Sequence, residues 1–157
     1  MSSFQTRRLN SSCHSPLAAR LRLANTKTMT ELAPLLTRIA DKRDDLIALT
    51  QDLIQIPTLN PPGNNYRDIC KYLERRLSTH GFTTKLIRAH GTPGDSEKYP
   101  RWNVVARRNG ARNGECVHFN SHTDVVEVGK GWTKDPFGGA LIDGKIYGRG
   151  ACDMKGG

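Results

Sequence analysis

The chain has 157 residues, of which 36% are hydrophobic and 25% are charged, and this length and composition are typical of one globular domain. Its net charge of +9 is concentrated in a tail, because residues 1–30 hold five basic residues and no acidic residue. The other 19 basic residues stand beside 15 acidic ones, so the composition argues against a nucleic-acid-binding face. No apolar run approaches the ~20 residues that a membrane-spanning helix needs, which argues against a membrane protein.

Residues 1–28 are predicted to be a basic, unstructured extension, and residues 29–157 are predicted to contain the folded domain. The favoured interpretation is that translation naturally starts at Met29. A mitochondrial transit peptide is the second interpretation, because the segment is rich in Arg and Ser and lacks acidic residues, and a solvated arm that binds an anionic surface is the third. The four cysteines show no Cys-x-x-Cys spacing, so we expect a reducing, cytoplasmic setting, with the mitochondrion as the alternative.

Two helices come first in the predicted domain. Apolar residues at helical spacing predict a helix over residues 41–55, with one or two extra turns in residues 32–39. A second helix is predicted over residues 66–79, with Asn65 as its N-cap and Gly81 as its C-cap.

Strands and loops follow the two helices. Residues 89–101 and 109–114 are rich in Gly, Pro or Asn, which predicts a loop and a turn. The predicted strands cover residues 82–88, 103–107, 116–121, 140–142 and 145–147, the last two as a hairpin around Asp143-Gly144. Helices followed by strands predict an α/β domain in which helices flank a mixed sheet.

The strongest chemical signal is a histidine and an aspartate two residues apart, His122 and Asp124, directly after the apolar residues 116–119. In a strand this spacing puts both side chains on one face, where a carboxylate can orient an imidazole that ligates a metal. The predicted strand over residues 116–121 would place His122 at its C-terminal end, where open α/β sheets bind ligands. The alternative for such a pair in isolation is a hydrogen-bonded histidine at a strand end with a capping aspartate.

A second aspartate, Asp153, lies in the glycine-rich residues 148–157, where the backbone can approach an ion closely. The alternative is that Asp153 caps a helix from Met154, but the Lys-Gly-Gly that follows is a poor helix opening. His118 shares a predicted strand face with His122. We reject His118 as a third ligand because every two residues of a strand add ~7 Å, so that His118, four residues before His122, would lie too far along the strand.

Together these segments resemble the zinc aminoacylase/carboxypeptidase family, which includes acetylornithine deacetylase and succinyl-diaminopimelate desuccinylase. The resemblance spans residues 31–157 and implies the N-terminal part of a zinc-exopeptidase-like catalytic domain, truncated before the rest of the site. The segments that carry it are Ser121–Val126 and Gly148–Gly157, with weaker matches at Ile56–Gly63, Trp132–Phe137 and Asp143-Gly144.

The resemblance implies a role for each candidate site residue. His122 would ligate zinc, Asp153 would bridge two zinc ions in the complete site, and Asp124 would be the catalytic residue that orients His122; Co²⁺ is the alternative metal. Arg149 is expected to order the loop around Asp153 rather than to clamp a substrate carboxylate. Because the family's Glu-Glu pair and later ligands are absent from these 157 residues, we expect this chain to be inactive alone.

The implied reaction is hydrolysis of the amide of an N-acyl amino acid, in amino-acid biosynthesis. A dipeptidase or carboxypeptidase of the same family is the nearest alternative, and a non-catalytic, truncated remnant with a basic arm is the other. The expected partners are a small N-acyl amino acid or short peptide and, in the full-length protein, a second copy in a homodimer. Neither nucleic acid nor membrane is expected as a partner.

Overall fold

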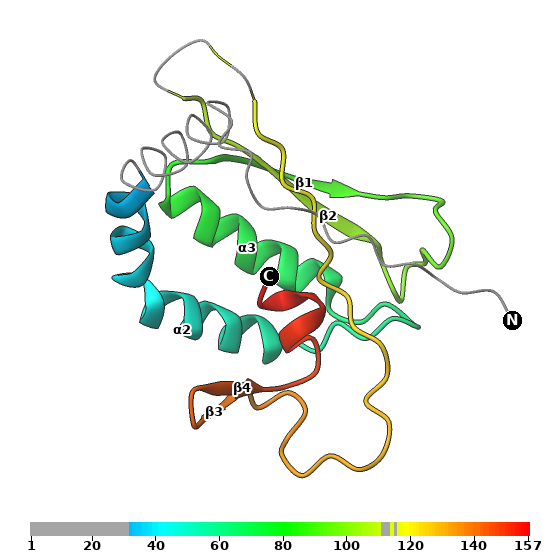
Figure 1. Ribbon diagram of the computed structural model, residues 1–157. Coiled ribbons are helices and arrows are strands. Elements are labelled where there is room, and N and C mark those ends of the chain that lie inside the picture. Colours follow the sequence, from blue (N-terminus) through cyan, green and yellow to red (C-terminus); the bar gives the residue numbers. More distant parts are fainter. Residues whose placement is uncertain (1–31, 111–113, 115) are drawn as a thin grey trace, which may run out of the picture. The chain divides into compact units, whose positions relative to one another are not determined.

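The computed structural model describes residues 32–110, 114 and 116–157 (Figure 1). The chain divides into two compact units between Arg43 and Asp44. In the first unit, residues 32–40 are helical, as the sequence predicts. The second unit contains the strands and the candidate site. The predicted extension over residues 1–28 and the centre of the predicted turn at 109–114 lie outside the described residues.

Both predicted helices of the domain form. Helix α2 covers Arg43–Ile54 and helix α3 covers Tyr66–Thr79. Helix α3 ends in a Schellman motif, because Gly81 adopts φ 79° and its N–H donates to Ser78 O. Asn65 occupies the N-cap position of α3, as predicted, but its side chain makes no capping hydrogen bond. Its backbone is left-handed (φ 57°), and its side-chain amide donates to Pro57 O at 2.8 Å instead.

The described strands form two small antiparallel sheets. Strand β1 (Thr83–Arg88) pairs with β2 (Trp102–Arg107). Strand β3 (Ala140–Ile142) pairs with β4 (Lys145–Tyr147) in the predicted hairpin. Its two turn residues, Asp143 and Gly144, both have positive φ, the conformation that a tight two-residue hairpin requires. Helices with small sheets are consistent with part of an α/β domain of the expected class.

The core lies where α3 packs against one face of the β1–β2 sheet, and Leu53 of α2 belongs to the same cluster (Figure 1). Inward residues of the two strands alternate with exposed ones, so the sheet has one packed face. Full burial of one large apolar side chain stabilises the fold by about 1.5–3 kcal/mol. The cluster consists of Leu53, Ile69 and Cys70, with Leu49, Ile56, Tyr72, Leu73, Leu86, Trp102 and Val104 packed against it.

The predicted strand over residues 116–121 is wrong. Residues 116–124 belong to no strand, and the side chains of Val117 and Phe119 are 75% and 88% exposed. An apolar, alternating sequence becomes a strand only when a neighbour accepts its backbone hydrogen bonds, and no other described segment pairs with these residues. His122 therefore does not follow a strand in this structure.

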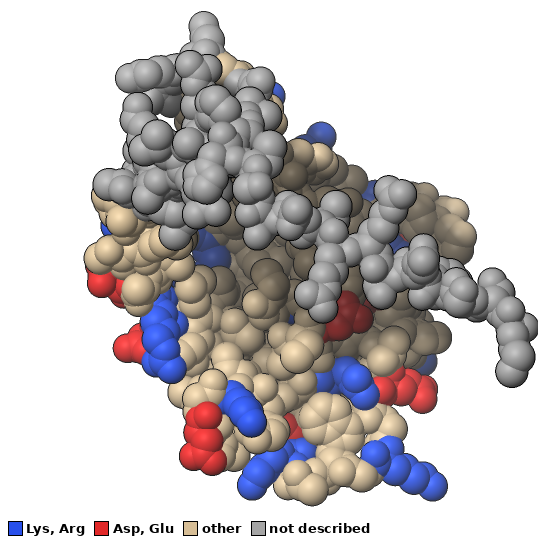
Figure 2. Space-filling model, in the orientation of Figure 1, with Lys and Arg blue, Asp and Glu red and all other residues tan. Residues whose placement is uncertain are grey.

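On the face shown in Figure 2, basic and acidic side chains are interspersed over the part of the surface that is not drawn in grey. No helix within the described residues is long and apolar enough to cross a membrane.

Candidate metal centre

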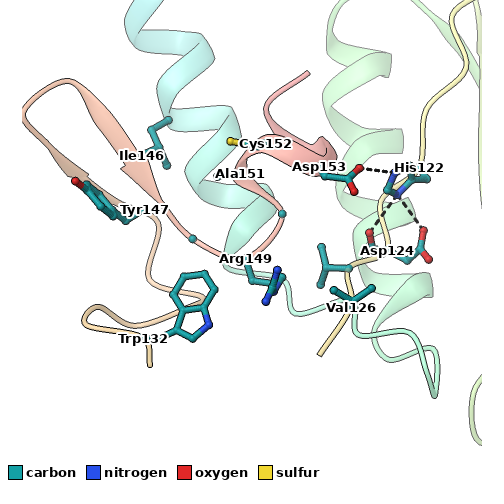
Figure 3. A pocket seen from close by; sticks show the side chains of 13 residues that line it. His122, Asp124, Val126, Trp132, Ile146, Tyr147, Arg149, Ala151, Cys152 and Asp153 are labelled. Carbon is teal, nitrogen blue, oxygen red and sulfur yellow. Dashed lines mark hydrogen bonds and ion pairs between the residues drawn. The ribbon is translucent and has the colours of Figure 1, made fainter. Parts of the chain in front are cut away.

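Three side chains from two distant segments converge beside a cavity of about 410 Å³ (Figure 3). His122 Nε2 lies 3.0 Å from Asp153 Oδ1. On the other side of the ring, His122 Nδ1 lies 3.2 Å from both Asp124 Oδ1 and the backbone oxygen of Asp124. The structure thus brings together the three residues that the sequence singles out, with Asp124 and Asp153 on opposite nitrogens of one imidazole.

Contacts with the loop that follows α2, and not pairing in a strand, fix the position of the His122–Asp124 segment. Val125 forms an isolated parallel bridge with Leu59, in which its N–H donates to Thr58 O at 2.9 Å and its carbonyl accepts from Asn60 N at 2.8 Å. The hydroxyl of Thr58, which is fully buried, donates to Thr123 O. Backbone contacts on both sides of Leu59 therefore fix the position of the motif.

Asp153 lies in a π-helical turn, Ala151–Lys155, whose N-terminal flank is Gly150. Asp153 and Met154 have non-helical φ and ψ, and the peptide bond between them is cis. Asp153 is therefore not the N-cap of a helix from Met154. The turn is tied to the end of α2 by Lys155, whose Nζ donates to Leu53 O at 2.9 Å and to Ile56 O at 2.7 Å.

The two carboxylates set the electrostatics of His122, whose side chain is 49% exposed. Burial lowers the pKa of His122, but the hydrogen bond with Asp153, the contact with the backbone of Asp124 and both carboxylate charges together outweigh this effect. The net result is a pKa raised above its usual value.

The donor set fits part of a zinc site. Imidazole nitrogen and carboxylate oxygen are both zinc ligands, and two such atoms on one tetrahedral zinc lie roughly 3–3.5 Å apart. The observed separation of His122 Nε2 and Asp153 Oδ1 is 3.0 Å. However, the described residues contain no group of three or more His, Cys, Asp or Glu side chains arranged to hold a metal. They thus offer a pair of ligands and not a closed site.

Arg149 lies beside the pair, between Val126 and Trp132 (Figure 3). Its Nη2 donates to Val128 O at 3.1 Å, and its guanidinium stacks 5.3 Å from the centre of the Trp132 ring. These contacts agree with the expected role in ordering the loop. His118, which the sequence analysis rejects as a ligand, does not line the cavity.

Sequence reasoning missed three supporting residues: Thr58, Asn60 and Lys155. Thr58 and Asn60 lie in the loop Ile56–Gly63, and Lys155 lies two residues after Asp153. Both segments were singled out for their sequence, but nothing in the spacing shows that their side chains reach Thr123, Asp124 and the end of α2.

Comparison with known proteins assigns a family to the part of the chain that carries these residues. Residues 118–157, which contain all three converging side chains, match Peptidase family M20/M25/M40. The family that the motifs predict is therefore confirmed, and it is a family of hydrolases.

Particular relatives extend the match over more of the chain. It is 42% identical over 115 residues to succinyl-diaminopimelate desuccinylase of Cereibacter sphaeroides and 41% identical over 115 residues to succinyl-diaminopimelate desuccinylase 2 of a Ruegeria species. It is 40% identical over 113 residues to the succinyl-diaminopimelate desuccinylase of Rhodospirillum rubrum. Each match covers 72% of this chain but only 26–27% of the relative, so the chain spans about a quarter of their length.

Proposed function

We propose that this chain provides part of the metal centre of a zinc-dependent hydrolase that cleaves the amide bond of N-acyl amino acids, of the succinyl-diaminopimelate desuccinylase type. The observation that carries the proposal is the approach of His122 Nε2 to Asp153 Oδ1, at 3.0 Å, within the residues that match the hydrolase family. The names of the relatives support a succinylated amino acid as the substrate class.

In this proposal each side chain has a defined task. Asp124 would accept a hydrogen bond from the Nδ1–H of His122, so that Nε2, which lies beside Asp153, would be free to ligate zinc. Asp153 adds a carboxylate beside Nε2 and would bridge the two zinc ions of a complete centre. When bound, zinc polarises the substrate carbonyl and lowers the pKa of a coordinated water. The apolar residues Val126 and Trp132 line the same cavity and would exclude water from the substrate.

Two wider assignments accompany this proposal. Residues 29–157 would form the N-terminal portion of the catalytic domain, with residues 1–28 outside it. Cytoplasmic localisation is supported by three cysteines that are free thiols, Cys70, Cys116 and Cys152, because a reducing compartment keeps thiols unpaired.

Equilibrium zinc binding to the 157-residue chain tests the proposal. Competition with a chromophoric chelator should reveal one weak site, because two protein ligands rarely hold zinc tightly. His122→Ala and Asp153→Ala should each abolish this binding. His118→Ala is the matched control, since His118 is exposed and lies in the same segment, and it should bind zinc as the wild type does.

Assays of the same samples on N-succinyl-diaminopimelate and N-acetylornithine should show no appreciable hydrolysis by the isolated chain, with or without zinc. Apart from the ligand pair and Asp124, the described residues that line the cavity include no histidine and no carboxylate that could act as a general base. Zinc binding that survives Asp153→Ala but is lost in His118→Ala would overturn the assignment of the ligands.

A further inference from the structure

Asn60 contacts the same carboxylate that orients His122. Its side-chain Nδ2 donates to Asp124 Oδ2 at 2.9 Å, while Asp124 Oδ1 lies 3.2 Å from His122 Nδ1. One oxygen of Asp124 is thus held by Asn60 and the other is left for His122. The backbone of Asn60 is fixed as well, because its N–H donates to Val125 O at 2.8 Å.

Arg101 determines the orientation of the Asn60 side-chain amide, that is, which neighbour its oxygen and its nitrogen face. Its Nη1 donates to Asn60 Oδ1 at 3.2 Å, and its Nη2 donates to Pro62 O at 3.2 Å. A guanidinium has only donors, and an ionised carboxylate has only acceptors. A single arrangement of the Asn60 amide therefore satisfies both neighbours, with the oxygen toward Arg101 and the NH₂ toward Asp124.

The guanidinium of Arg101 lies between an aromatic ring and two glycines, whose lack of a side chain makes room for it. It stacks 4.9 Å from the centre of the Tyr66 ring. Gly63 and Gly94, both with positive φ, approach it so closely that a Cβ at either position would overlap the guanidinium. The backbone N–H of Arg101 also donates to Asp95 Oδ1 at 2.9 Å. Two hydrogen bonds and a ring contact from separate segments thus position the guanidinium, and its Nε is buried without a hydrogen-bond partner among the described residues.

We propose that Asn60 and Arg101 are positioning residues, which hold Asp124 in the orientation that pairs with His122. Arg101 fixes the Asn60 amide, Asn60 fixes one oxygen of Asp124, and the other oxygen then fixes the imidazole. The consequence for zinc binding rests on the proposed function, whereas the effect on the His122 ring is measurable without zinc.

The test uses the whole chain labelled with ¹⁵N-histidine, with the His122 ring signals assigned by His122→Gln. At one fixed pH and without zinc, Asn60→Asp and Arg101→Met should both shift the Nδ1 signal of His122. Asn60→Asp keeps the size of the side chain and its bond to Arg101 but replaces the donor to Asp124 with a carboxylate that repels it, so the Nδ1 signal of His122 should shift. Asn103→Ala and Arg107→Met, both at exposed positions of β2, are the matched controls and should leave the signal unmoved.

Zinc affinity supplies the second measurement. Loss of a group that orients a metal ligand directly weakens metal binding about 10–100-fold, so the more remote Asn60→Asp should weaken zinc binding roughly 3–10-fold. Unchanged His122 signals in folded Asn60→Asp would overturn the positioning role even if zinc binds. Shifted signals in a chain that binds no zinc would sustain the positioning role and reject the proposed function. If Arg101→Met fails to fold, Arg101→Lys and Asn60→Asp decide the outcome.

Discussion

Lys155 Nζ donates a 2.7 Å hydrogen bond to the backbone oxygen of Ile56, and this bond joins the turn that carries Asp153 to the residues that end α2. Lys155 is 6% exposed, and its burial lowers the pKa of its ammonium group to about 8. A cation is favoured near the C-terminal end of a helix, where the helix dipole is negative. The position of the proposed bridging carboxylate therefore depends on a buried lysine two residues away.

Replacement of this lysine should destabilise the fold. We expect Lys155→Met to lower the free energy of unfolding by about 1–3 kcal/mol, because the buried backbone oxygen of Leu53 loses its donor. Urea unfolding followed by circular dichroism measures the change. Lys145→Met, at an exposed position of β4, should change stability by less than about 0.5 kcal/mol. Equal losses in the two variants would contradict the anchoring role.

Asp95 should control stability in acid. Its pKa is lowered to about 2, first by the hydrogen bond from the Arg101 backbone and then by that from the Arg88 side chain. Because the folded pKa is lower than the unfolded one, this contribution is present above the unfolded pKa and is lost as the pH falls toward 2. Melting temperatures between neutral pH and pH 2 should therefore drop less steeply in Asp95→Asn, which starts from a lower value.

The matched control for Asp95 is Glu97→Gln. Glu97 also approaches Arg88, at 3.6 Å, but its side chain is 94% exposed. An exposed ion pair contributes little, so this variant should follow the wild-type pH curve. A curve for Asp95→Asn that is parallel to the wild type throughout this range would show that Asp95 is not responsible for the acid sensitivity.

Thr58 should matter more than its size suggests. Its hydroxyl is fully buried and donates to the carbonyl of Thr123, next to His122. Thr58→Val keeps the shape but leaves that carbonyl without its donor, which should cost about 1–3 kcal/mol of unfolding free energy. Thr83→Val on the exposed face of β1 is the control and should be nearly neutral. An unchanged free energy of unfolding in Thr58→Val would mean that the backbone bridge between Leu59 and Val125 positions the motif without the Thr58 hydrogen bond.

Deletion of residues 1–28 tests the proposed domain boundary. Their charge and weak periodicity predict no part in the core. The melting temperature should therefore change by less than about 2 °C, since ~1 kcal/mol corresponds to roughly 2–4 °C in a chain of this length. A fall of several degrees, measured by differential scanning calorimetry, would assign these residues to the folded domain.

The helices and the β3–β4 hairpin were predictable because their signals are local. Helix α3 follows from the spacing of Ile69 and Leu73 and from Gly81 after its end, and the β3–β4 hairpin follows from Asp143-Gly144. The strand over residues 116–121 failed for the opposite reason. An apolar run shows which side chains prefer burial, but strand pairing depends on a partner that the run itself does not contain.

The candidate site divides in the same way. His122, Asp124 and Asp153 were predictable because they lie in two short, recognisable motifs, Ser121–Val126 and Gly148–Gly157. The contacts that hold them were not, because each joins residues that are distant in sequence: Asn60 contacts Asp124, Arg101 contacts Asn60, and Lys155 contacts Leu53. Long polar side chains such as these give no periodic signal, and their partners are backbone oxygens or other side chains that only the fold brings near.

The measurement that tests the central claim most directly is a zinc titration of the ¹⁵N-histidine-labelled chain, followed at the five histidine rings. We expect the Nε2 signal of His122 to move on addition of zinc while its Nδ1 stays protonated against Asp124, and we expect Asp153→Ala to remove this response. Zinc-dependent changes confined to His80, His90 or His118, with His122 unaffected, would contradict the account.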